Sequence, residues 1–377
     1  MNINKRFPCI DDLEAEAARR IPGFAHEYLI GGLGREICVQ RNLDDLAQMQ
    51  LMPSFHGEIS GPSIECEFLG KKYSAPFGVA PLGLAGLLWP GSETILAKAA
   101  KSHNIPYVLS TYATISMQAS RALSDDMGWF QFYPPNDQDL EQDIIQRAIK
   151  AGYDTLMVTV DTPTATKRER DLRNGISVPL SFDHRTLGQI VSHPRWLLAM
   201  LKQGMPEFEV LKPYFPVSND VTAAGMFITD KMQGRITVAR LQRIRRLWPG
   251  KIMVKGILCE QDAKAYLKAG ADGLVISNHG GRQFDAAPSA GAVLPRIRKE
   301  VGKAVPIIAD GGIRSGLDIA KMLSLGADFV LLGRPFIYAC AALGDKGGEH
   351  IMNILKDELR SAVSQMGCSD LEGVQKE

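Results

Sequence analysis

Short apolar runs alternate with helix-like segments along most of the chain from residue 76 onward. Eight runs are apolar on both faces, as buried parallel strands are: PFGVAP (76–81), IPYVLS (105–110), WFQFY (129–133), TLMVTVD (155–161), KIMVKG (251–256), DGLVISN (272–278), VPIIAD (305–310) and DFVLLG (328–333). The segments between them include SETILAKAAKSH, LEQDIIQRAIKAG, EQDAKAYLKAG and GLDIAKMLSLGA, which have helical periodicity. Eight such units predict an α/β fold, a closed (β/α)8 TIM barrel.

Two regions depart from this alternation. In residues 1–70 we expect amphipathic helices at about 11–20 and 23–30, followed by irregular chain to about Gly70. This N-terminal helical extension should pack on a barrel of residues 71–377, giving one domain overall. A long insertion from about Leu172 to Gly234 separates the fourth strand from its helix, and it predicts a lid, a binding loop or a disordered segment.

Composition and charge exclude several classes of protein. The chain is 45% hydrophobic and 23% charged, as globular proteins are, and its formal charge of +1 gives no basic surface for nucleic acid. The six cysteines form no C-x-x-C pair, so we expect reduced thiols and no metal site. The sequence contains neither a signal-like apolar core near residue 1 nor an apolar run of about 18 residues, which predicts a cytoplasmic protein.

Glycine and arginine follow the seventh and eighth strands. The segments are ADGGIRSG, which contains Arg314, and LLGRP, which contains Arg334. In a TIM barrel these two loops commonly bind phosphate through backbone N–H groups. The glycines could instead serve only tight turns, but two adjacent loops with two arginines favour a phosphate site.

Lys255 closes the fifth apolar run and is followed by glycine. Because active sites of such barrels lie at the C-terminal ends of the strands, its ammonium group should face an anion or a developing negative charge. A surface lysine whose stem covers apolar residues is the structural alternative.

His279 lies in SNHGGRQFD, directly after the sixth apolar run and three residues before Arg282. Imidazole is the usual general base at neutral pH, and a guanidinium group binds a carboxylate with two hydrogen bonds. Asp161, at the end of the fourth run, is a candidate to orient the histidine ring. A structural histidine, and an aspartate that caps a helix or pairs with Arg168, are the alternatives. The sequence contains no G-x-S-x-G motif, so it gives no indication of a serine nucleophile.

With these residues the chain resembles the FMN-dependent 2-hydroxy acid oxidase and dehydrogenase family, which includes glycolate oxidase, flavocytochrome lactate dehydrogenase and mandelate dehydrogenase. The similarity runs from IPGFAHEYLIGG to SQMGC and is most specific in SNHGGRQ, DGGIRSG and LLGRP. It implies that an L-2-hydroxy acid is oxidised to a 2-oxo acid, with a histidine base and with flavin N5 as the two-electron acceptor.

The resemblance also implies roles for individual residues. The FMN-binding set is Ala80, Pro81, Leu82, Gly83, Ser110, Gln131, Thr159, Lys255, Ser277, Asp310, Gly311, Gly312, Arg314, Gly333 and Arg334. Lys255 would stabilise the reduced flavin, and the last six residues would hold the phosphate. The substrate set is Tyr28, Tyr112, Tyr133, Arg168 and Arg282, of which Tyr28 and Arg282 would bind the carboxylate. His279 would be the base, with Asp161 behind it.

Three local features are similar to the membrane-associated dehydrogenases of this family: Gly83 where oxidases more often have alanine, GLAGLLWPGSE, and SHPRWLLAMLKQGMPEF. They imply a quinone as electron acceptor, with oxygen, reduced to hydrogen peroxide, as the alternative. They also imply peripheral contact with the inner face of the membrane through residues 186–216. An oligomer-contact helix or a mobile lid would explain the same composition. A homotetramer is expected.

The chain departs from the family pattern at several positions. Thr164, Ala165 and Thr166 replace the usual arginine and glycine after TVDTP, and a family tryptophan is missing near Thr237 and Val238. Tyr112 takes a position that is often tryptophan in glycolate oxidase. These departures leave specificity for small acids open. The second hypothesis is a different FMN phosphate-barrel oxidoreductase or isomerase that acts on a larger substrate, and the pair of His279 and Arg282 argues against it. A flavin-binding scaffold without catalysis is disfavoured, because the expected catalytic and carboxylate-binding residues are present.

Overall fold

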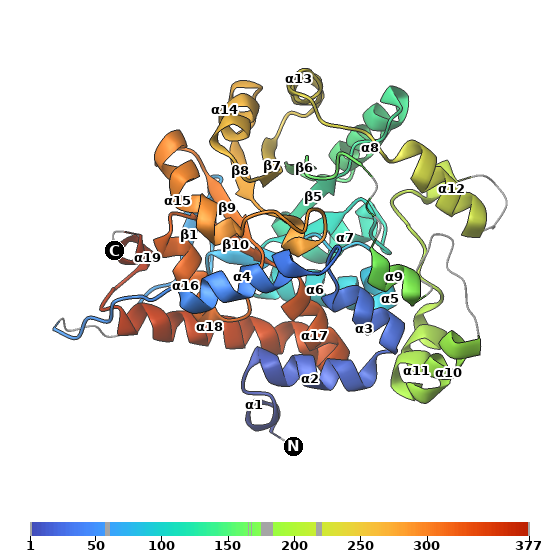
Figure 1. Cartoon of the computed structure of the whole chain (residues 1–377), viewed down its shortest axis with the longest axis horizontal. Helices are drawn as coiled ribbons and strands as arrows, with labels where there is room; N and C mark the ends of the chain where they lie inside the picture. The colour runs from blue at the N-terminus through green and yellow to red at the C-terminus, as the bar shows by residue number, and fades with distance from the viewer. Residues whose placement is uncertain are drawn as a thin grey trace.

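A computed structural model describes residues 2–56, 61–164, 166, 168–174, 184–215 and 221–375. Eight parallel strands form a closed barrel in chain order, with the last strand paired to the first. They are β3 (Phe77–Val79), β4 (Tyr107–Ser110), β5 (Gly128–Phe132), β6 (Thr155–Thr159), β7 (Lys251–Ile257), β8 (Gly273–Ile276), β9 (Ile307–Asp310) and β10 (Phe329–Leu332). The predicted TIM barrel is therefore confirmed (Figure 1).

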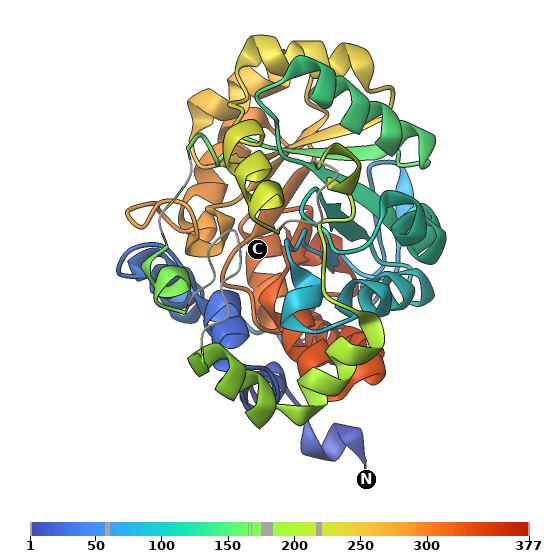
Figure 2. The same ribbon diagram turned by 90° about the vertical axis from the view of Figure 1, so that its right-hand side faces the viewer.

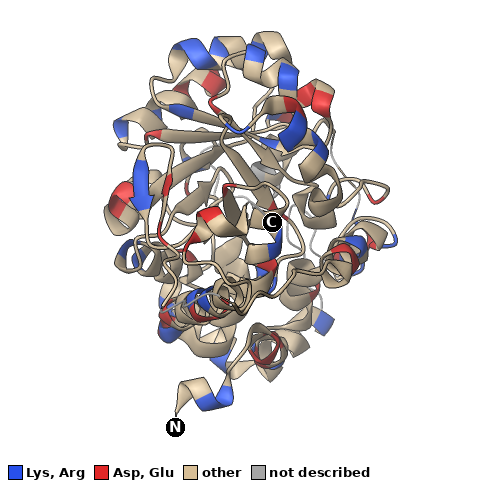
Figure 3. Ribbon diagram, turned by 90° about the vertical axis from the view of Figure 1, so that its left-hand side faces the viewer, with Lys and Arg blue, Asp and Glu red and all other residues tan. Residues whose placement is uncertain are grey.

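Helices surround the barrel, and each buries an apolar face against the strands or against neighbouring helices. They are α6 (Ser92–Ser102), α7 (Met117–Ser124), α8 (Gln138–Lys150), α13 (Val238–Leu247), α14 (Glu260–Lys268), α15 (Ala290–Val301), α16 (Gly316–Ser324), α17 (Arg334–Leu343) and α18 (Gly347–Gln365). In α8, for example, Ile144, Ile145 and Ala148 are buried, and the side chain of Asp137 caps the first turn. Basic and acidic residues are interspersed along the outer helices (Figure 3).

The predicted fourth strand extended to residue 161, but β6 ends at Thr159. Asp161 therefore lies in the loop that follows the strand, where its side chain can turn toward the barrel mouth. The helices predicted at 92–103, 140–152, 260–270 and 316–327 correspond to α6, α8, α14 and α16 with ends that differ by two or three residues at most.

The N-terminal region contains α1 (Ile3–Arg6), α2 (Ile10–Arg20), α3 (Gly23–Ile30) and α4 (Ile37–Gln48), and α2 lies beside α17 (Figure 1). The two predicted helices match α2 and α3. The expectation of irregular chain up to Gly70 was wrong, because α4 and a β-hairpin lie there. The buried stripe of α4 consists of Cys38, Asn42 and Leu46, and the polar residue in its middle breaks the apolar periodicity on which the prediction relied.

The hairpin of β1 (Cys66–Phe68) and β2 (Lys71–Tyr73) closes the N-terminal end of the barrel. The ring of Phe68 stacks on Phe329 with centroids 5.0 Å apart, and Tyr73 meets the same ring edge-on at 5.6 Å. Trp129 completes this aromatic layer. All four side chains are at most 4% exposed, so this end of the barrel is sealed by apolar packing.

The region between β6 and α13 contains α9 (Glu169–Arg173), α10 (His184–Ser192), α11 (Pro194–Gln203) and α12 (Val221–Lys231). Within the predicted insertion, residues 175–183 and 216–220 lie outside the described residues. In Figure 2 these helices lie in front of the barrel, on the side of its mouth. Trp196 of α11 donates its indole N–H to the carbonyl of Leu87 in α5 (Ala85–Leu88) at 3.1 Å.

None of the helices in the described ranges is long and apolar enough to cross a membrane. The division of the chain at residues 70 and 71 remains a prediction.

Candidate active site

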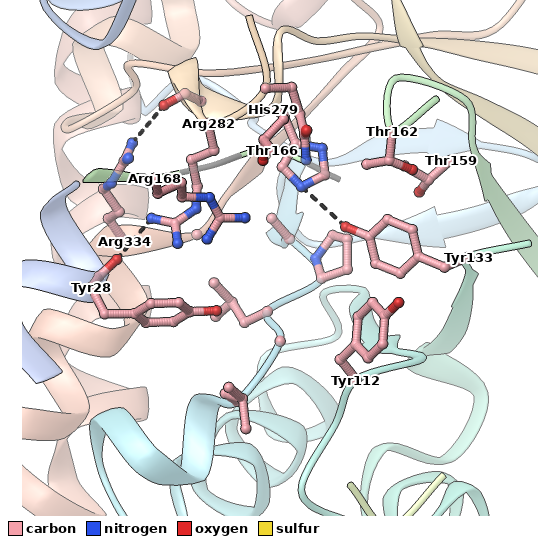
Figure 4. Close-up of a pocket in the computed structure, with 18 of the residues that line it drawn as sticks. Tyr28, Tyr112, Tyr133, Thr159, Thr162, Thr166, Arg168, His279, Arg282 and Arg334 are labelled. Atoms are coloured by element: carbon pink, nitrogen blue, oxygen red, sulfur yellow. Dashed lines mark hydrogen bonds between the residues drawn. The ribbon is translucent and has the colours of Figure 1, made fainter. Parts of the chain in front are cut away.

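A cavity of about 640 Å³ opens at the C-terminal ends of the barrel strands, a volume typical of ligand pockets. Most of the predicted site residues line it, although they come from all parts of the chain (Figure 4). They are Tyr28, Ala80, Pro81, Leu82, Gly83, Tyr112, Tyr133, Thr159, Arg168, Lys255, His279, Arg282, Asp310, Gly311, Gly312, Arg314, Gly333 and Arg334.

Four predicted residues lie behind this wall and support it through hydrogen bonds: Ser110, Gln131, Asp161 and Ser277. Ser110 donates to Gln131 Oε1 at 3.1 Å, and Gln131 Nε2 donates to Thr159 Oγ1 at 2.8 Å. This chain of polar groups crosses the ends of three adjacent strands, β4, β5 and β6. It can present hydrogen-bonding groups to a flat heterocycle at the bottom of the cavity.

His279 is held between two polar partners. Its Nδ1 lies 3.0 and 3.1 Å from the two carboxylate oxygens of Asp161, and its Nε2 lies 3.0 Å from the hydroxyl of Tyr133. The carboxylate fixes the proton on Nδ1, which leaves the lone pair of Nε2 on the cavity side. Burial alone would raise the pKa of Asp161, but the nearby His279 ring and Lys255 ammonium lower it, so the residue stays ionised.

Both alternatives proposed for Asp161 are set aside by this contact. Arg168 pairs with Asp171 instead, at 3.2 Å, and Asp161 bonds to the histidine ring rather than to a helix terminus. Burial, and then the charge of Asp161, raise the pKa of Tyr133 well above its usual value. Tyr133 therefore remains protonated and donates to His279 Nε2.

The catalytic candidate lies in an unusual turn, the short 3-10 segment η3 (His279–Gly281). His279 has φ of +59°, a left-handed conformation that is uncommon for a residue other than glycine, and the next two glycines have φ of +63° and +80°. The backbone N–H of His279 donates to Ser277 Oγ at 3.0 Å. The turn directs the ring back over the barrel mouth, but it needs support from its surroundings.

Two arginines face the cavity near Tyr28 (Figure 4). The guanidinium of Arg282 lies 4.7 Å from the centre of the Tyr28 ring and donates to the carbonyls of Tyr28 and Gly31 at 2.7 and 2.9 Å. Arg168 lies 6.0 Å from the same ring, and its buried Nε has no hydrogen-bond partner among the described residues. Burial, and then the charge of Arg168, lower the pKa of Arg282. Such a pair is suited to a substrate carboxylate.

The predicted phosphate loops supply both glycine conformations and positive charge. Gly311 and Gly312 have φ of +105° and +82°, which only glycine adopts without strain. Arg334 donates to the carbonyls of Leu29, Gly31 and Gly280 at 2.9, 2.9 and 3.1 Å, a use of this side chain that the sequence did not indicate.

Burial, and then the charges of Arg314 and Arg282, lower the pKa of Arg334 to about 9. Within the described ranges these three arginines form no ion pair with a carboxylate. A phosphate group would supply the missing negative charge, so the residues present fit the phosphate of FMN better than a simple pair of tight turns.

Lys255 is 5% exposed and its ammonium group lies 2.7 Å from Ser277 Oγ and 3.1 Å from Asp310 Oδ2. The surface-lysine alternative is therefore wrong. Neighbours just after β8 and at the end of β9 hold its charge at the cavity wall, where it can stabilise negative charge on a bound ring.

Several cavity residues were not found from the sequence. Phe208, Ile228, Met232 and Gln233 come from the insertion, where no strand end marks a functional position. The ring of Tyr112 lies 4.9 Å from that of Tyr133 and 5.8 Å from that of Phe208. Of the family departures, Thr164 and Thr166 line the cavity, and Ala165 lies outside the described residues.

Comparison with known proteins identifies the family. Residues 17–377 match the model of the FMN-dependent dehydrogenases. The chain is 36% identical over 362 residues to (S)-mandelate dehydrogenase of Pseudomonas putida, an alignment that covers 96% of this chain and 91% of that protein. It is also 36% identical over 364 residues to L-lactate dehydrogenase of Pectobacterium atrosepticum, covering 96% and 94%.

Solved structures lead to the same family. The monotopic membrane protein (S)-mandelate dehydrogenase superposes with a TM-score of 0.91 at 35% identity, covering 96% of each chain. A mandelate oxidase superposes with a TM-score of 0.83 at 29% identity, covering 98% of this chain and 97% of that one. The chain therefore belongs to the FMN-dependent dehydrogenases, and it is an FMN-dependent oxidoreductase of 2-hydroxy acids.

Proposed function

We propose that this enzyme oxidises an L-2-hydroxy acid with a bulky apolar substituent to the 2-oxo acid and passes the electrons to a quinone. The observation that carries the proposal is that His279 and two arginines, Arg168 and Arg282, line the same cavity (Figure 4). A general base beside a carboxylate site matches the two functional groups of a 2-hydroxy acid.

The substrate carboxylate binds between Arg168 and Arg282, beside the ring of Tyr28. The free Nε of Arg168 provides a donor that the protein leaves unused among the described residues. Both guanidinium groups already lie against Tyr28 at 6.0 and 4.7 Å, so little side-chain entropy remains to be lost when the anion binds. This contact fixes the C2 carbon next to His279.

His279 Nε2 accepts a proton from the bound acid, and the Asp161 carboxylate stabilises the imidazolium ion that forms. The Tyr133 hydroxyl, now bonded to Nε2, can shift its hydrogen bond to the substrate oxygen. Bound FMN supplies the two-electron acceptor for this oxidation.

The residues proposed to hold FMN fall into two groups. Gly311, Gly312, Arg314, Gly333 and Arg334 surround the phosphate, where backbone N–H groups and arginine charge meet. The flavin ring would be held by residues 80–83, which follow β3, by Lys255 and by the hydrogen-bonded chain of Ser110, Gln131 and Thr159.

The substituent of the acid lies against the apolar part of the cavity wall. Leu88, Tyr112, Phe208, Ile228 and Met232 give this wall an apolar surface. Such a wall gains free energy from an aromatic or branched substituent, at about 25 cal/mol per Å² of apolar area buried. A methyl group would leave much of this surface uncovered, so we expect mandelate-like acids to react better than lactate.

Anaerobic reduction of the FMN-loaded enzyme tests the proposal. Each acid of a panel from glycolate through lactate to (S)- and (R)-mandelate is mixed with enzyme, and bleaching of the flavin absorbance is followed. We expect the S acids with large substituents to bleach the flavin fastest. Bleaching by none of the acids would contradict the proposed reaction.

The acceptor is tested by reoxidation of the reduced enzyme with a soluble quinone or with oxygen. We expect fast reoxidation by quinone and slow reoxidation by oxygen. The likeness to a mandelate oxidase supports the competing possibility, which predicts fast reaction with oxygen and stoichiometric hydrogen peroxide.

We further propose that α10 and α11 contact a membrane surface, within the predicted range of 186–216, of which residue 216 lies outside the described residues. Five apolar side chains on and after these helices are more than half exposed: Leu187, Val191, Leu198, Leu201 and Met205. Arg195 and Lys202 accompany them, as in helices that lie at a bilayer interface. The likeness to a monotopic membrane protein supports this assignment.

Co-sedimentation with vesicles of phosphatidylethanolamine and phosphatidylglycerol tests the membrane proposal. Replacing Leu198 and Leu201 together by serine should release the enzyme from the vesicles. Phe284→Ser, which removes an apolar side chain that is 64% exposed elsewhere, is the matched control and should still sediment. Equal binding of both variants would exclude α11 as the contact. Light scattering of the purified enzyme tests the expected homotetramer.

A further inference from the structure

Two buried asparagines connect the N-terminal region to the turn that carries His279. Asn42, in α4, donates to Asn278 Oδ1 at 3.0 Å, and Asn278 Nδ2 donates back to Asn42 Oδ1 at 2.7 Å. The two residues are 2% and 3% exposed. They are separated by 236 positions in sequence, so the reciprocal amide pair joins distant segments of the chain.

The same Asn278 side chain supports the strained turn. Its Oδ1 accepts the backbone N–H of Gly281 at 3.2 Å, and its Nδ2 also donates to the carbonyl of Pro288 at 2.9 Å. Hydrogen bonds to both Oδ1 and Nδ2 therefore fix the orientation of the Asn278 amide. Asn42 takes part in two of these bonds. Without Asn42, the amide of Asn278 would keep fewer bonds in a buried place and could rotate away from Gly281.

Asn42 also contacts the loop that binds the phosphate. A Cβ atom placed on Gly312 would lie 2.5 Å from the backbone oxygen of Asn42, and one on Gly311 would lie 3.3 Å from Asn278 Oδ1. The two glycines therefore rest directly on the asparagine pair. The asparagine pair therefore contacts both the turn that carries His279 and the glycine loop that is proposed to bind the phosphate.

We propose that Asn42 is a positioning residue that, through Asn278, holds the left-handed turn of His279 and sets it in register with the phosphate loop at Gly311 and Gly312. The proposal rests on the assignment of His279 as the base. In this arrangement α4 is part of the catalytic apparatus, although Asn42 contacts neither substrate nor the reacting atoms. A misplacement of a base by about 1 Å can cost roughly 100-fold in rate, so two hydrogen bonds of this kind have a measurable effect.

The test compares three variants on the same helix. Asn42→Ala removes both bonds to Asn278. Leu46→Ala removes a buried apolar side chain of α4 and leaves the amide pair intact. Gln40→Ala changes an exposed residue that bonds only to Asp44 within the helix, at 2.8 Å. All three are prepared as full-length protein, with and without FMN.

Three measurements separate positioning from stability. In Asn42→Ala we expect the rate of flavin reduction at saturating acid to fall about 10- to 100-fold with less than a threefold change in KM. We expect the dissociation constant of FMN, measured by fluorescence quenching, to rise about tenfold. With histidines labelled at ¹³Cε1, and His279→Gln used for assignment, we expect the His279 signal to move. Leu46→Ala should lower Tm and leave these three quantities near the wild-type values, and Gln40→Ala should change nothing.

A double-mutant cycle sharpens the result. Asn278→Ala should slow reduction by at least as much as Asn42→Ala, and the double variant should be no slower than Asn278→Ala alone. Additive effects would overturn the proposal, because they would mean that Asn42 does not act through Asn278. An Asn42→Ala enzyme with lower Tm but unchanged reduction rate, FMN affinity and His279 signal would overturn it as well. If no acid reduces the wild-type enzyme, the proposed reaction fails, whereas the FMN affinity and the His279 signal still decide the role of Asn42.

Discussion

At the N-terminal end of the barrel the side chains of Phe68, Tyr73, Trp129 and Phe329 form an aromatic layer, whereas charged groups gather at the C-terminal end. The aromatic layer gains free energy from burial and ring packing alone. At the mouth, Arg282, Arg314 and Arg334 lack carboxylate partners within the described ranges, and burial lowers the pKa of Arg334 to about 9. One end of the barrel is held by apolar packing, and the other carries buried positive charge that a bound anion would balance.

The largest effect is expected at the mouth. His279→Gln keeps a side chain of similar size but removes the base, so the rate of flavin reduction should fall about 10²- to 10⁴-fold. Anaerobic stopped-flow absorbance gives this rate, and Tm of the variant should stay close to that of the wild type. An unchanged reduction rate would refute the assignment of the base.

A substitution with a free-energy effect of similar size at the N-terminal end of the barrel should lower stability and leave the reaction rate unchanged. Phe329→Ala opens a cavity in the aromatic layer and should lower the free energy of unfolding by about 3–5 kcal/mol. Urea unfolding measures this value, and kcat per folded molecule should change by less than about twofold. A loss of activity without loss of stability would mean that the two ends are not independent.

Removal of FMN tests how much of the enzyme's stability depends on ligand binding at the barrel mouth. Because FMN binds the folded state, a free concentration 100 times its dissociation constant should stabilise the enzyme by about 2.7 kcal/mol. Thermal unfolding of apo and loaded enzyme measures the shift. Inorganic phosphate, as a partial substitute, should raise Tm of the apo enzyme by a smaller amount, and no response to either ligand would contradict the phosphate assignment.

The smallest effect concerns a buried carboxyl group behind the mouth. Glu93, in α6, is 4% exposed and accepts the backbone N–H of Thr114 at 2.8 Å, two residues after Tyr112. Burial raises the pKa of Glu93 from 4.5 to about 7, although the bonds from Thr114 oppose the shift. The folded state therefore holds this proton more tightly than the unfolded chain, and the stabilisation is full below pH 4.5 and is lost as the pH rises through 7.

Glu93→Gln should accordingly raise the stability at pH 8 by about 1–3 kcal/mol and have little effect at pH 5. Urea unfolding at both pH values measures the difference. Glu65→Gln, at an exposed position, is the control and should show no such dependence. A difference that is equal at both pH values would contradict the raised pKa.

The sequence predicts the barrel well because its signal is local. Each strand is a short apolar run, and each helix has its own periodicity and its own terminus. The site could be predicted for a related reason: residues that follow such runs meet at one end of the barrel, as His279, Lys255 and Arg282 do. No knowledge of long-range contacts is needed for that step.

Other parts of the site depend on contacts that leave no local pattern. The helix α4 was missed because its central buried residue, Asn42, is polar and finds its partner 236 positions away. Phe208, Ile228 and Met232 reach the cavity from an insertion without strand ends. Only the folded chain decides that Asp161 bonds to His279 while Arg168 pairs with Asp171.

The aromatic layer beneath the barrel has a consequence for the order of events during turnover. Because the floor is sealed, the hydroxy acid, the oxo acid and the electron acceptor all use the end of the barrel that faces the insertion. If the oxo acid occupies the proposed site between Arg168 and Arg282, it would obstruct the approach of the acceptor. Release of the oxo acid and reoxidation would then be coupled by geometry, and a slowly leaving product should inhibit both halves of the catalytic cycle.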